Sequence, residues 1–136
     1  MNDESNSNNT QKDELIKYWT EKADESLQSA RSEYQNERLS FAMNRIYYSA
    51  FYALTALFKS NDKVFRKHKE LRSALHRELI RQGTLDKSWG KFFDEVFESR
   101  QRGDYMPMVR FENEQVEYLL EQADIFLTEI KKLLSK

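Results

Sequence analysis

The sequence predicts an all-α protein, an up-and-down bundle of about five helices, and two observations support this prediction. The chain of 136 residues contains three glycines and one proline, so few positions interrupt a helix. Apolar residues recur at helical spacing in five separate stretches. The chain has no cysteine, so disulfides do not hold the fold together. Its length suits one domain with its own hydrophobic core.

The five apolar stripes follow one another along the chain with short connections. They cover residues 15–34, 39–57, 71–79, 89–97 and 116–134. Ser40 is a candidate N-cap for the second helix, and the fourth helix is expected to start near Asp86. Gly83 is a plausible stop for the third helix, because glycine readily adopts the left-handed conformation that follows many helices.

The sequence divides into a disordered polar tail at residues 1–11 and a folded domain at residues 12–136. The tail lacks the basic and apolar parts of a signal peptide, and no apolar run approaches the roughly 20 residues of a membrane-spanning helix. We therefore expect a cytoplasmic protein that does not associate with a membrane. The formal net charge is −1, so a site for nucleic acid must be a local basic patch.

The second predicted helix carries apolar or aromatic side chains nearly all round. A strip of small residues adjoins its core stripe, at Ala42, Ser49, Ala53 and Ala56. A further strip holds Phe41, Arg45, Tyr48, Tyr52, Thr55 and Lys59. Such a helix is expected at the centre of the bundle and beside a second chain. The aromatic residues have core filling as an alternative role, whereas a buried Arg45 needs a carboxylate or phosphate partner.

The stretch FESRQRGDYMP, residues 97–107, raises the possibility of a site at a helix end. Arg100 continues the core-side spacing of Phe93 and Val96, so it is expected to project toward a neighbouring helix or a groove. Gly103 and Pro107 predict that the helix gives way to a turn there. The turn would leave Arg100, Asp104 and Tyr105 near one corner. An ordinary helix end is the alternative interpretation.

The stretch NRIYYSAFYALTALF, residues 44–58, resembles the second-helix signature of HEPN domains (higher eukaryotes and prokaryotes nucleotide-binding). Lys67-His68, the RQGTLD turn and R-x-x-G-D-Y then follow in the matching order. The resemblance covers roughly residues 12–134 and is strongest for small prokaryotic members encoded beside a minimal nucleotidyltransferase. It implies a helical domain that forms a homodimer, with a groove across the interface and a minimal nucleotidyltransferase as partner.

Many members of that family are metal-independent ribonucleases and toxins, whose motif is an Arg followed four to six residues later by a His. A polar residue of the second helix assists. Arg100 matches the motif arginine and Asn44 the polar position, but Tyr105 and Met106 occupy the place of the histidine. Tyrosine, with a pKa near 10, exchanges protons poorly at neutral pH. His68 is a substitute if the fold brings it to the groove.

Two functions therefore remain open. The first is a non-catalytic subunit that binds nucleotide or RNA and partners a nucleotidyltransferase. Its phosphate and base contacts would come from Arg45, Arg100, Arg102, Tyr48, Tyr52, Lys67 and His68. The second is a ribonuclease toxin with an altered site at Asn44, Arg100 and Tyr105, inactivated by adenylylation of Tyr105. His76 reads as a surface or boundary side chain, and no metal-ligand spacing or phosphate-binding glycine loop predicts a cofactor.

Overall fold

The computed structural model describes residues 3–136, with side chains from residue 9 onward. Its helices are α1 (Asp3–Gln35), α2 (Leu39–Ser60), α3 (His68–Ala74), the π-helical segment η1 (Leu75–Ile80), α4 (Lys87–Tyr105) and α5 (Asn113–Leu134). The described part of the chain contains no strand. The all-α prediction and the five helical stretches are confirmed, with α3 and η1 together forming the third stretch.

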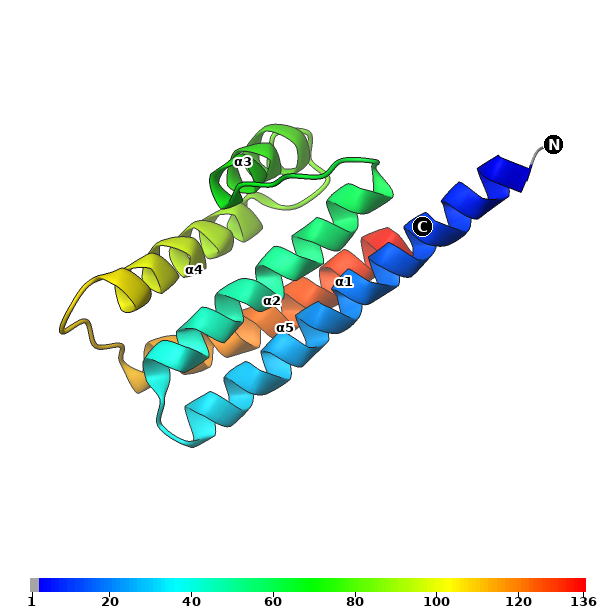
Figure 1. Cartoon of the computed structure of the whole chain (residues 1–136). Helices are drawn as coiled ribbons and strands as arrows, with labels where there is room; N and C mark the ends of the chain where they lie inside the picture. The colour runs from blue at the N-terminus through cyan, green and yellow to red at the C-terminus, as the bar shows by residue number, and fades with distance from the viewer. Residues whose placement is uncertain (1–2) are drawn as a thin grey trace.

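Helix α2 is the central element of the bundle. Figure 1 shows α1 and α5 along one side of α2, and α4 with α3 along the other. The buried residues of α2 cover more than half of its circumference and include Tyr47, Phe58 and the small residues Ala42, Ser49, Ala53 and Ala56. This arrangement explains why the sequence of α2 is apolar almost all round.

The two side strips of α2 have different surroundings. The small residues are buried inside the single chain, with exposed fractions of 3% or less, so they serve packing within the bundle and do not face a second chain. The second strip lies at the surface: Phe41 and Arg45 are exposed, and Tyr48 and Tyr52 are half-buried. The guanidinium of Arg45, which the sequence analysis considered as a buried group, is therefore exposed in the structure.

The predicted helix ends are partly confirmed. Asp86 precedes α4, and its carboxylate accepts a hydrogen bond of 2.9 Å from the Ser88 backbone N–H, as an N-cap does. Gly83 follows η1 with φ of +79°, in agreement with its expected role as a helix stop. Ser40 is not a cap, because α2 begins at Leu39 and its N-cap residue is Arg38.

The prediction of a turn at Gly103 is wrong. Helix α4 continues through Gly103 and ends at Tyr105, so this tyrosine also belongs to the helix. Glycine is needed at position 103 for a different reason, because a Cβ there would lie 2.9 Å from ring carbon Cε2 of Phe111. The chain turns only after Tyr105, where Met108 has φ of +63°, and Phe111 then packs back against α4.

The first turns of α1 extend past the end of the other helices (Figure 1). Helix α1 begins at Asp3, although the sequence predicts a disordered tail over residues 1–11; residues 1–2 lie outside the described ones. Residues 3–11 contain no glycine or proline that would stop a helix, and residues 9–11 are exposed. The domain boundary at residue 12 stays a prediction.

Candidate functional site

Four polar side chains meet where α2 passes the C-terminal end of α4. Arg100 Nη2 donates a hydrogen bond of 3.2 Å to the Tyr48 hydroxyl. Asn44 Nδ2 donates one of 3.0 Å to Asp104 Oδ2, and Arg100 Nε lies 3.2 Å from the same carboxylate oxygen. We call these four residues the Arg100 cluster.

The local geometry of the Arg100 cluster follows from helical spacing. Arg100 and Asp104 are four residues apart on α4, and Asn44 and Tyr48 are four residues apart on α2, so each pair shares one helix face. The two faces oppose each other across the helix interface. As the sequence predicts, Arg100 lies at the end of the apolar stripe of α4, and its side chain is only 12% exposed.

Aromatic rings surround the guanidinium of Arg100. Its central carbon lies 5.1 Å from the ring centroid of Tyr47, 5.4 Å from that of Tyr48 and 5.8 Å from that of Tyr105, within the range of cation–π attraction. Nε is buried and faces Asp104 as an ion pair, but without the alignment of a hydrogen bond. Nη1 makes no hydrogen bond within the described chain, so it is available to a ligand.

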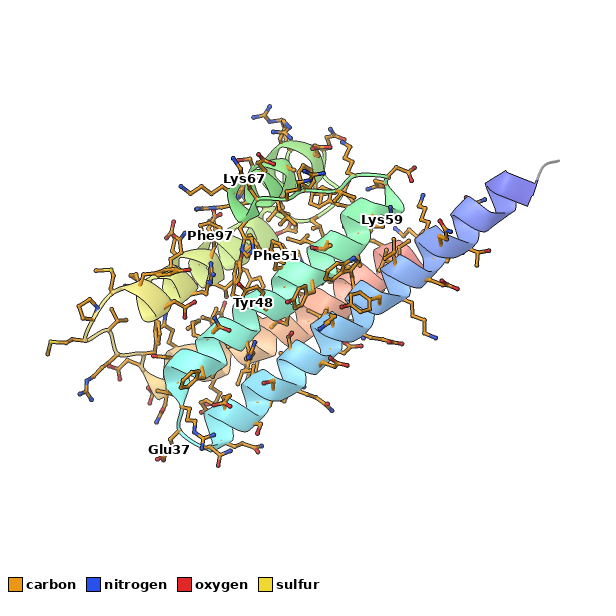
Figure 2. The ribbon with its side chains drawn as sticks, viewed as in Figure 1. Glu37, Tyr48, Phe51, Lys59, Lys67 and Phe97 are labelled. Atoms are coloured by element: carbon orange, nitrogen blue, oxygen red, sulfur yellow. The ribbon has the colours of Figure 1, made fainter. Side chains whose placement is uncertain are left out.

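His68 adjoins the Arg100 cluster through two tyrosines. It is the first residue of α3, and its Nδ1 lies 2.8 Å from the Tyr47 hydroxyl. Its ring stacks on Phe51 at 4.2 Å and meets the edge of Tyr48 at 5.9 Å. Figure 2 places Tyr48 and Phe51 in succession along α2, with Phe97 of α4 nearby.

The protonation states of His68 and Tyr47 are set chiefly by burial. Burial lowers the pKa of His68 below its usual value, and the positive charge of Arg100 lowers it further. Burial also raises the pKa of the Tyr47 hydroxyl well above its usual range, although Arg100 opposes this shift. Near neutral pH the pair therefore consists of a neutral imidazole and a neutral phenol.

Three predicted cationic residues lie outside the Arg100 cluster. Arg45 is exposed on α2, and Lys67 is the exposed residue immediately before α3. Arg102 is exposed on α4, where it lines a separate cavity of about 810 Å³ together with Tyr105. None of the three side chains forms a hydrogen bond or ion pair with the Arg100 cluster within the described chain, so any role in phosphate binding has to be at its margin.

The two predicted aromatic residues Tyr52 and Tyr105 have opposite surroundings. Tyr52 is half-buried and stacks on Trp19, with ring centroids 5.5 Å apart and planes inclined by 24°. The face of Tyr52 that contacts Trp19 is therefore occupied and cannot stack a base. Tyr105 is 73% exposed, and its ring approaches Arg100 from the end of α4.

Comparison with known proteins matches the HEPN domain model to residues 16–133. The chain belongs to the HEPN domain family. A Thermotoga maritima protein named "UPF0332 protein" is 40% identical over 124 residues, which cover 91% of this chain and 94% of that protein. A Methanocaldococcus jannaschii protein named "Putative toxin" is 35% identical over 114 residues, which cover 84% of this chain and 78% of that protein. A second protein of that name from the same organism is 25% identical over 123 residues, covering 90% and 91%.

The HEPN match contains every residue of the Arg100 cluster and confirms the resemblance seen in the sequence. Two residues near Arg100 were not among the predicted site residues. Asp104 had a usable signal, because it follows Arg100 by one helical turn. Tyr47 had none, because it continues the core stripe of Met43 and Ile46 and is fully buried.

His76 of this HEPN domain belongs to a separate ion network. Asp94 Oδ1 accepts hydrogen bonds from Arg72 Nε at 2.8 Å and pairs with His76 Nε2 at 2.9 Å, while Arg72 Nη2 reaches Glu98 at 3.1 Å. This network ties α3 and η1 to α4. It fits the boundary role expected for His76 and leaves His68 as the histidine beside the Arg100 cluster.

Two kinds of feature are absent from the described part of the HEPN chain. Among the residues that the structure describes, no three histidine or acidic side chains come together as metal ligands would. No helix in the same part of the chain combines the length and apolar character needed to cross a bilayer.

Proposed function

We propose that this HEPN protein is the toxin-like member of a two-component pair and binds RNA by holding a phosphate at the Arg100 cluster. The observation that supports this most directly is the state of Arg100. Its guanidinium is nearly buried and fixed by aromatic rings, yet Nη1 has no partner within the described chain. The naming of two relatives as toxins favours the same reading.

A phosphate suits Arg100 better than its present partner does. Guanidinium groups bind phosphate oxygens through paired, charge-assisted hydrogen bonds. The Asp104 carboxylate now balances the charge, but its contact with Nε lacks hydrogen-bond alignment. A phosphodiester carries a full negative charge and two free acceptor oxygens, so it can compete for Arg100 by making the aligned contacts that Asp104 does not make.

The partner we propose is a minimal nucleotidyltransferase, as the family resemblance implies, and the functional form is a homodimer in the cytoplasm. The exposed part of the α2 strip, with Phe41 and Arg45, supports an interface on that helix. The exposed phenol of Tyr105 supports access by a modifying enzyme.

A second candidate function, ribonuclease activity, is favoured by the position of His68. In this reaction a base removes the proton of a ribose 2′-hydroxyl, whose oxygen bonds to the adjacent phosphorus as the bond to the 5′-oxygen breaks, and the 5′-oxygen leaves as a hydroxyl after taking a proton from water. His68 is neutral near pH 7 because burial lowers its pKa, so it can accept that proton. Arg100 would stabilise the negative charge that develops on the phosphate oxygens.

Binding of a short unstructured RNA, followed by fluorescence anisotropy, tests the proposal. Arg100→Ala should weaken binding at least roughly tenfold, as expected for the loss of a charge-assisted phosphate contact. The control is Lys91→Ala, which removes an exposed cation from the same helix. Unchanged affinity in Arg100→Ala, together with a large fall in melting temperature, would show that Arg100 is structural.

Analysis of the RNA ends separates binding from cleavage. If the chain is a ribonuclease, wild type should produce 2′,3′-cyclic phosphate ends, and His68→Asn should stop cleavage while the RNA binding that depends on Arg100 persists. Asparagine keeps an oxygen that can accept the Tyr47 hydroxyl but cannot exchange protons near neutral pH. Intact RNA after prolonged incubation with wild type would exclude cleavage, and RNA binding would then be the remaining function.

A further inference from the structure

A second cavity lies beside the Arg100 cluster, between α1, α2 and the segment that leads into α3. It has a volume of about 360 Å³, and the lining residues important here are Trp19, Phe51, Lys59, Phe65, Arg66 and His68. We call it the aromatic cavity. Its volume falls within the range of roughly 300–1,000 Å³ for small-ligand pockets. None of its lining residues except His68 belongs to the site predicted from the sequence.

We propose that the aromatic cavity binds one unpaired nucleobase of an RNA strand, whose neighbouring phosphate lies at the Arg100 cluster. The inference rests on the proposed RNA-binding function and adds a specific base subsite to it. Single-stranded RNA is recognised in this way, with splayed bases stacked on aromatic side chains and phosphates held by cations.

The walls of the aromatic cavity are planar rings that remain accessible. Trp19, Phe51, Phe65 and His68 are all half-buried, in contrast to the fully buried rings of the core. Phe51 and His68 stack on each other, with centroids 4.2 Å apart and planes inclined by 27°, and Trp19 stacks on Tyr52, so a base would meet the edges and the remaining faces of these rings. Flat, partly exposed surfaces of this kind suit a planar ligand.

The charges around the cavity favour a ligand that carries phosphate. Lys59, Lys63 and Arg66 contribute to its lining, and no acidic side chain does. Lys63 is paired with Glu78, but Lys59 and Arg66 form no ion pair with any residue whose side chain the structure describes. A purely apolar ligand or peptide segment would leave these two cations without a partner, whereas a nucleotide supplies the negative charge.

His68 connects the aromatic cavity to the Arg100 cluster. It lines the cavity and bonds through Nδ1 to Tyr47. Its ring also contacts Tyr48, whose hydroxyl accepts the hydrogen bond from Arg100. The base subsite and the phosphate subsite are therefore adjacent parts of one surface. His68 Nε2 has no hydrogen-bond partner within the described chain, so it is available to the edge of a base.

The two tryptophans of the chain allow a direct test. Trp89→Phe leaves Trp19 as the sole tryptophan and hence a fluorescent reporter in the cavity wall. Trp89 packs against Phe92 and Phe126, a setting that phenylalanine can fill. We expect a short oligoadenylate to quench Trp19 fluorescence, AMP to do so more weakly, and ribose 5-phosphate, which has no base, to have no effect.

Variants then locate the ligand. The double substitution Lys59→Glu and Arg66→Glu should reduce the apparent affinity for oligoadenylate about tenfold, and so should Phe51→Leu, because stacking and charge both contribute. A charge-matched control, Lys87→Glu with Lys91→Glu, changes two exposed lysines of α4 and should have little effect. Trp19→Phe, which leaves only Trp89, should show no quenching.

The outcomes distinguish this inference from the function on which it rests. Arg100-dependent binding of oligoadenylate without quenching of Trp19 would overturn the base subsite and leave RNA binding intact. Quenching by AMP without binding of oligoadenylate would overturn both, and would reassign the cavity to free nucleotides. Equal losses in the Lys59/Arg66 variant and the Lys87/Lys91 control would overturn the subsite, because binding would then be a general charge effect.

Discussion

Arg100 illustrates how a single side chain can be fixed and still remain available to a ligand. Tyr47 and Tyr48 contact its guanidinium, and Asp104 balances its charge. Tyr47 is fully buried and the Arg100 side chain is 12% exposed, so a cation–π contact here contributes about 2 kcal/mol, as desolvated pairs do. The rings therefore hold the orientation of the guanidinium, while the Asp104 contact, which lacks hydrogen-bond alignment, is the one that a phosphate can replace.

Asp104→Asn tests this balance at the residue scale. The substitution removes the negative charge but keeps a side-chain oxygen that can accept the Asn44 hydrogen bond. We expect RNA affinity at low salt to rise about three- to tenfold, because Arg100 no longer has to break an ion pair with a carboxylate before it binds phosphate. The gain should shrink at high salt, where screening weakens the competing ion pair. A fall in affinity would mean that Asp104 is needed to position Arg100.

The pKa of His68 gives a second prediction at this scale. Because burial and Arg100 lower it below 6.5 in the folded chain, the unfolded chain binds the proton more readily between the two pKa values. The contribution of His68 to the free energy of unfolding is therefore complete above about pH 6.5 and is lost as the pH falls toward the folded pKa. Proton NMR can follow the titration of both histidines.

The assignment and the control for this titration are simple because the chain has two histidines. His68→Asn identifies the signal of His68 by its loss. The midpoint of His68 should lie below 6.5 and should move upward in Arg100→Ala, which removes the second cause of the shift. A midpoint at or above 6.5 in wild type would contradict the burial of this imidazole.

At the scale of elements, the end of α4 depends on a contact far from it in sequence. The α4 backbone passes so close to Phe111 that a Cβ at position 103 would lie 2.9 Å from the Phe111 ring, which would have to move. Phe111 lies beyond the loop that follows α4, just before α5. Gly103 therefore joins the end of α4 to the start of α5, and the Arg100 cluster lies on the helical turn that this contact holds.

Gly103→Ala should destabilise the fold by about 1 kcal/mol. Alanine favours a helix over glycine by roughly 1 kcal/mol, but the new Cβ would lie 2.9 Å from the Phe111 ring, and overpacking costs about 1–3 kcal/mol. Chemical denaturation measures the difference. Combining Gly103→Ala with Phe111→Leu should recover part of the loss relative to Phe111→Leu alone. An alanine variant more stable than wild type would show that Phe111 moves aside freely.

The same contact shows what the sequence can and cannot predict. Apolar spacing was enough for the helices, and the fit of Asp86 to an N-cap needed only local information. The role of Gly103 could not be predicted locally, because its cause is a ring on the far side of a loop. The aromatic cavity was missed for the same reason. Trp19, Phe51 and Phe65 come from three segments, and each one read alone resembles a core residue.

For the whole molecule, we predict a homodimer with the exposed strip of α2 at the interface. Phe41 is 65% exposed, and Arg45 beside it on the next turn is exposed as well, so a second chain can cover both. Sedimentation velocity at micromolar concentration should show a dimer. Phe41→Asp should shift it toward the monomer, whereas Ile125→Asp, at a 48% exposed position of α5, should not. A monomeric wild type would remove the prediction.

The proposed pairing with a nucleotidyltransferase leads to a prediction at Tyr105. This phenol is 73% exposed at the end of α4, and its ring lies 5.8 Å from the Arg100 guanidinium. A partner enzyme could transfer the adenylyl group of ATP to it. The phenolic oxygen would bond to the α-phosphorus, pyrophosphate would leave, and the phenolic proton would be released. The bulky phosphate ester would then compete with RNA for Arg100, so modification should abolish RNA binding.

Incubation of the chain with the proposed nucleotidyltransferase partner and ATP, followed by intact-mass measurement, tests the modification. We expect the mass of one adenylyl group to be added to wild type and to Tyr118→Phe, which removes another exposed tyrosine, but not to Tyr105→Phe. RNA anisotropy on the modified protein should show the loss of binding. Addition of the same mass to Tyr105→Phe would assign the acceptor elsewhere, and modified wild type that still binds RNA would separate Tyr105 from the phosphate subsite.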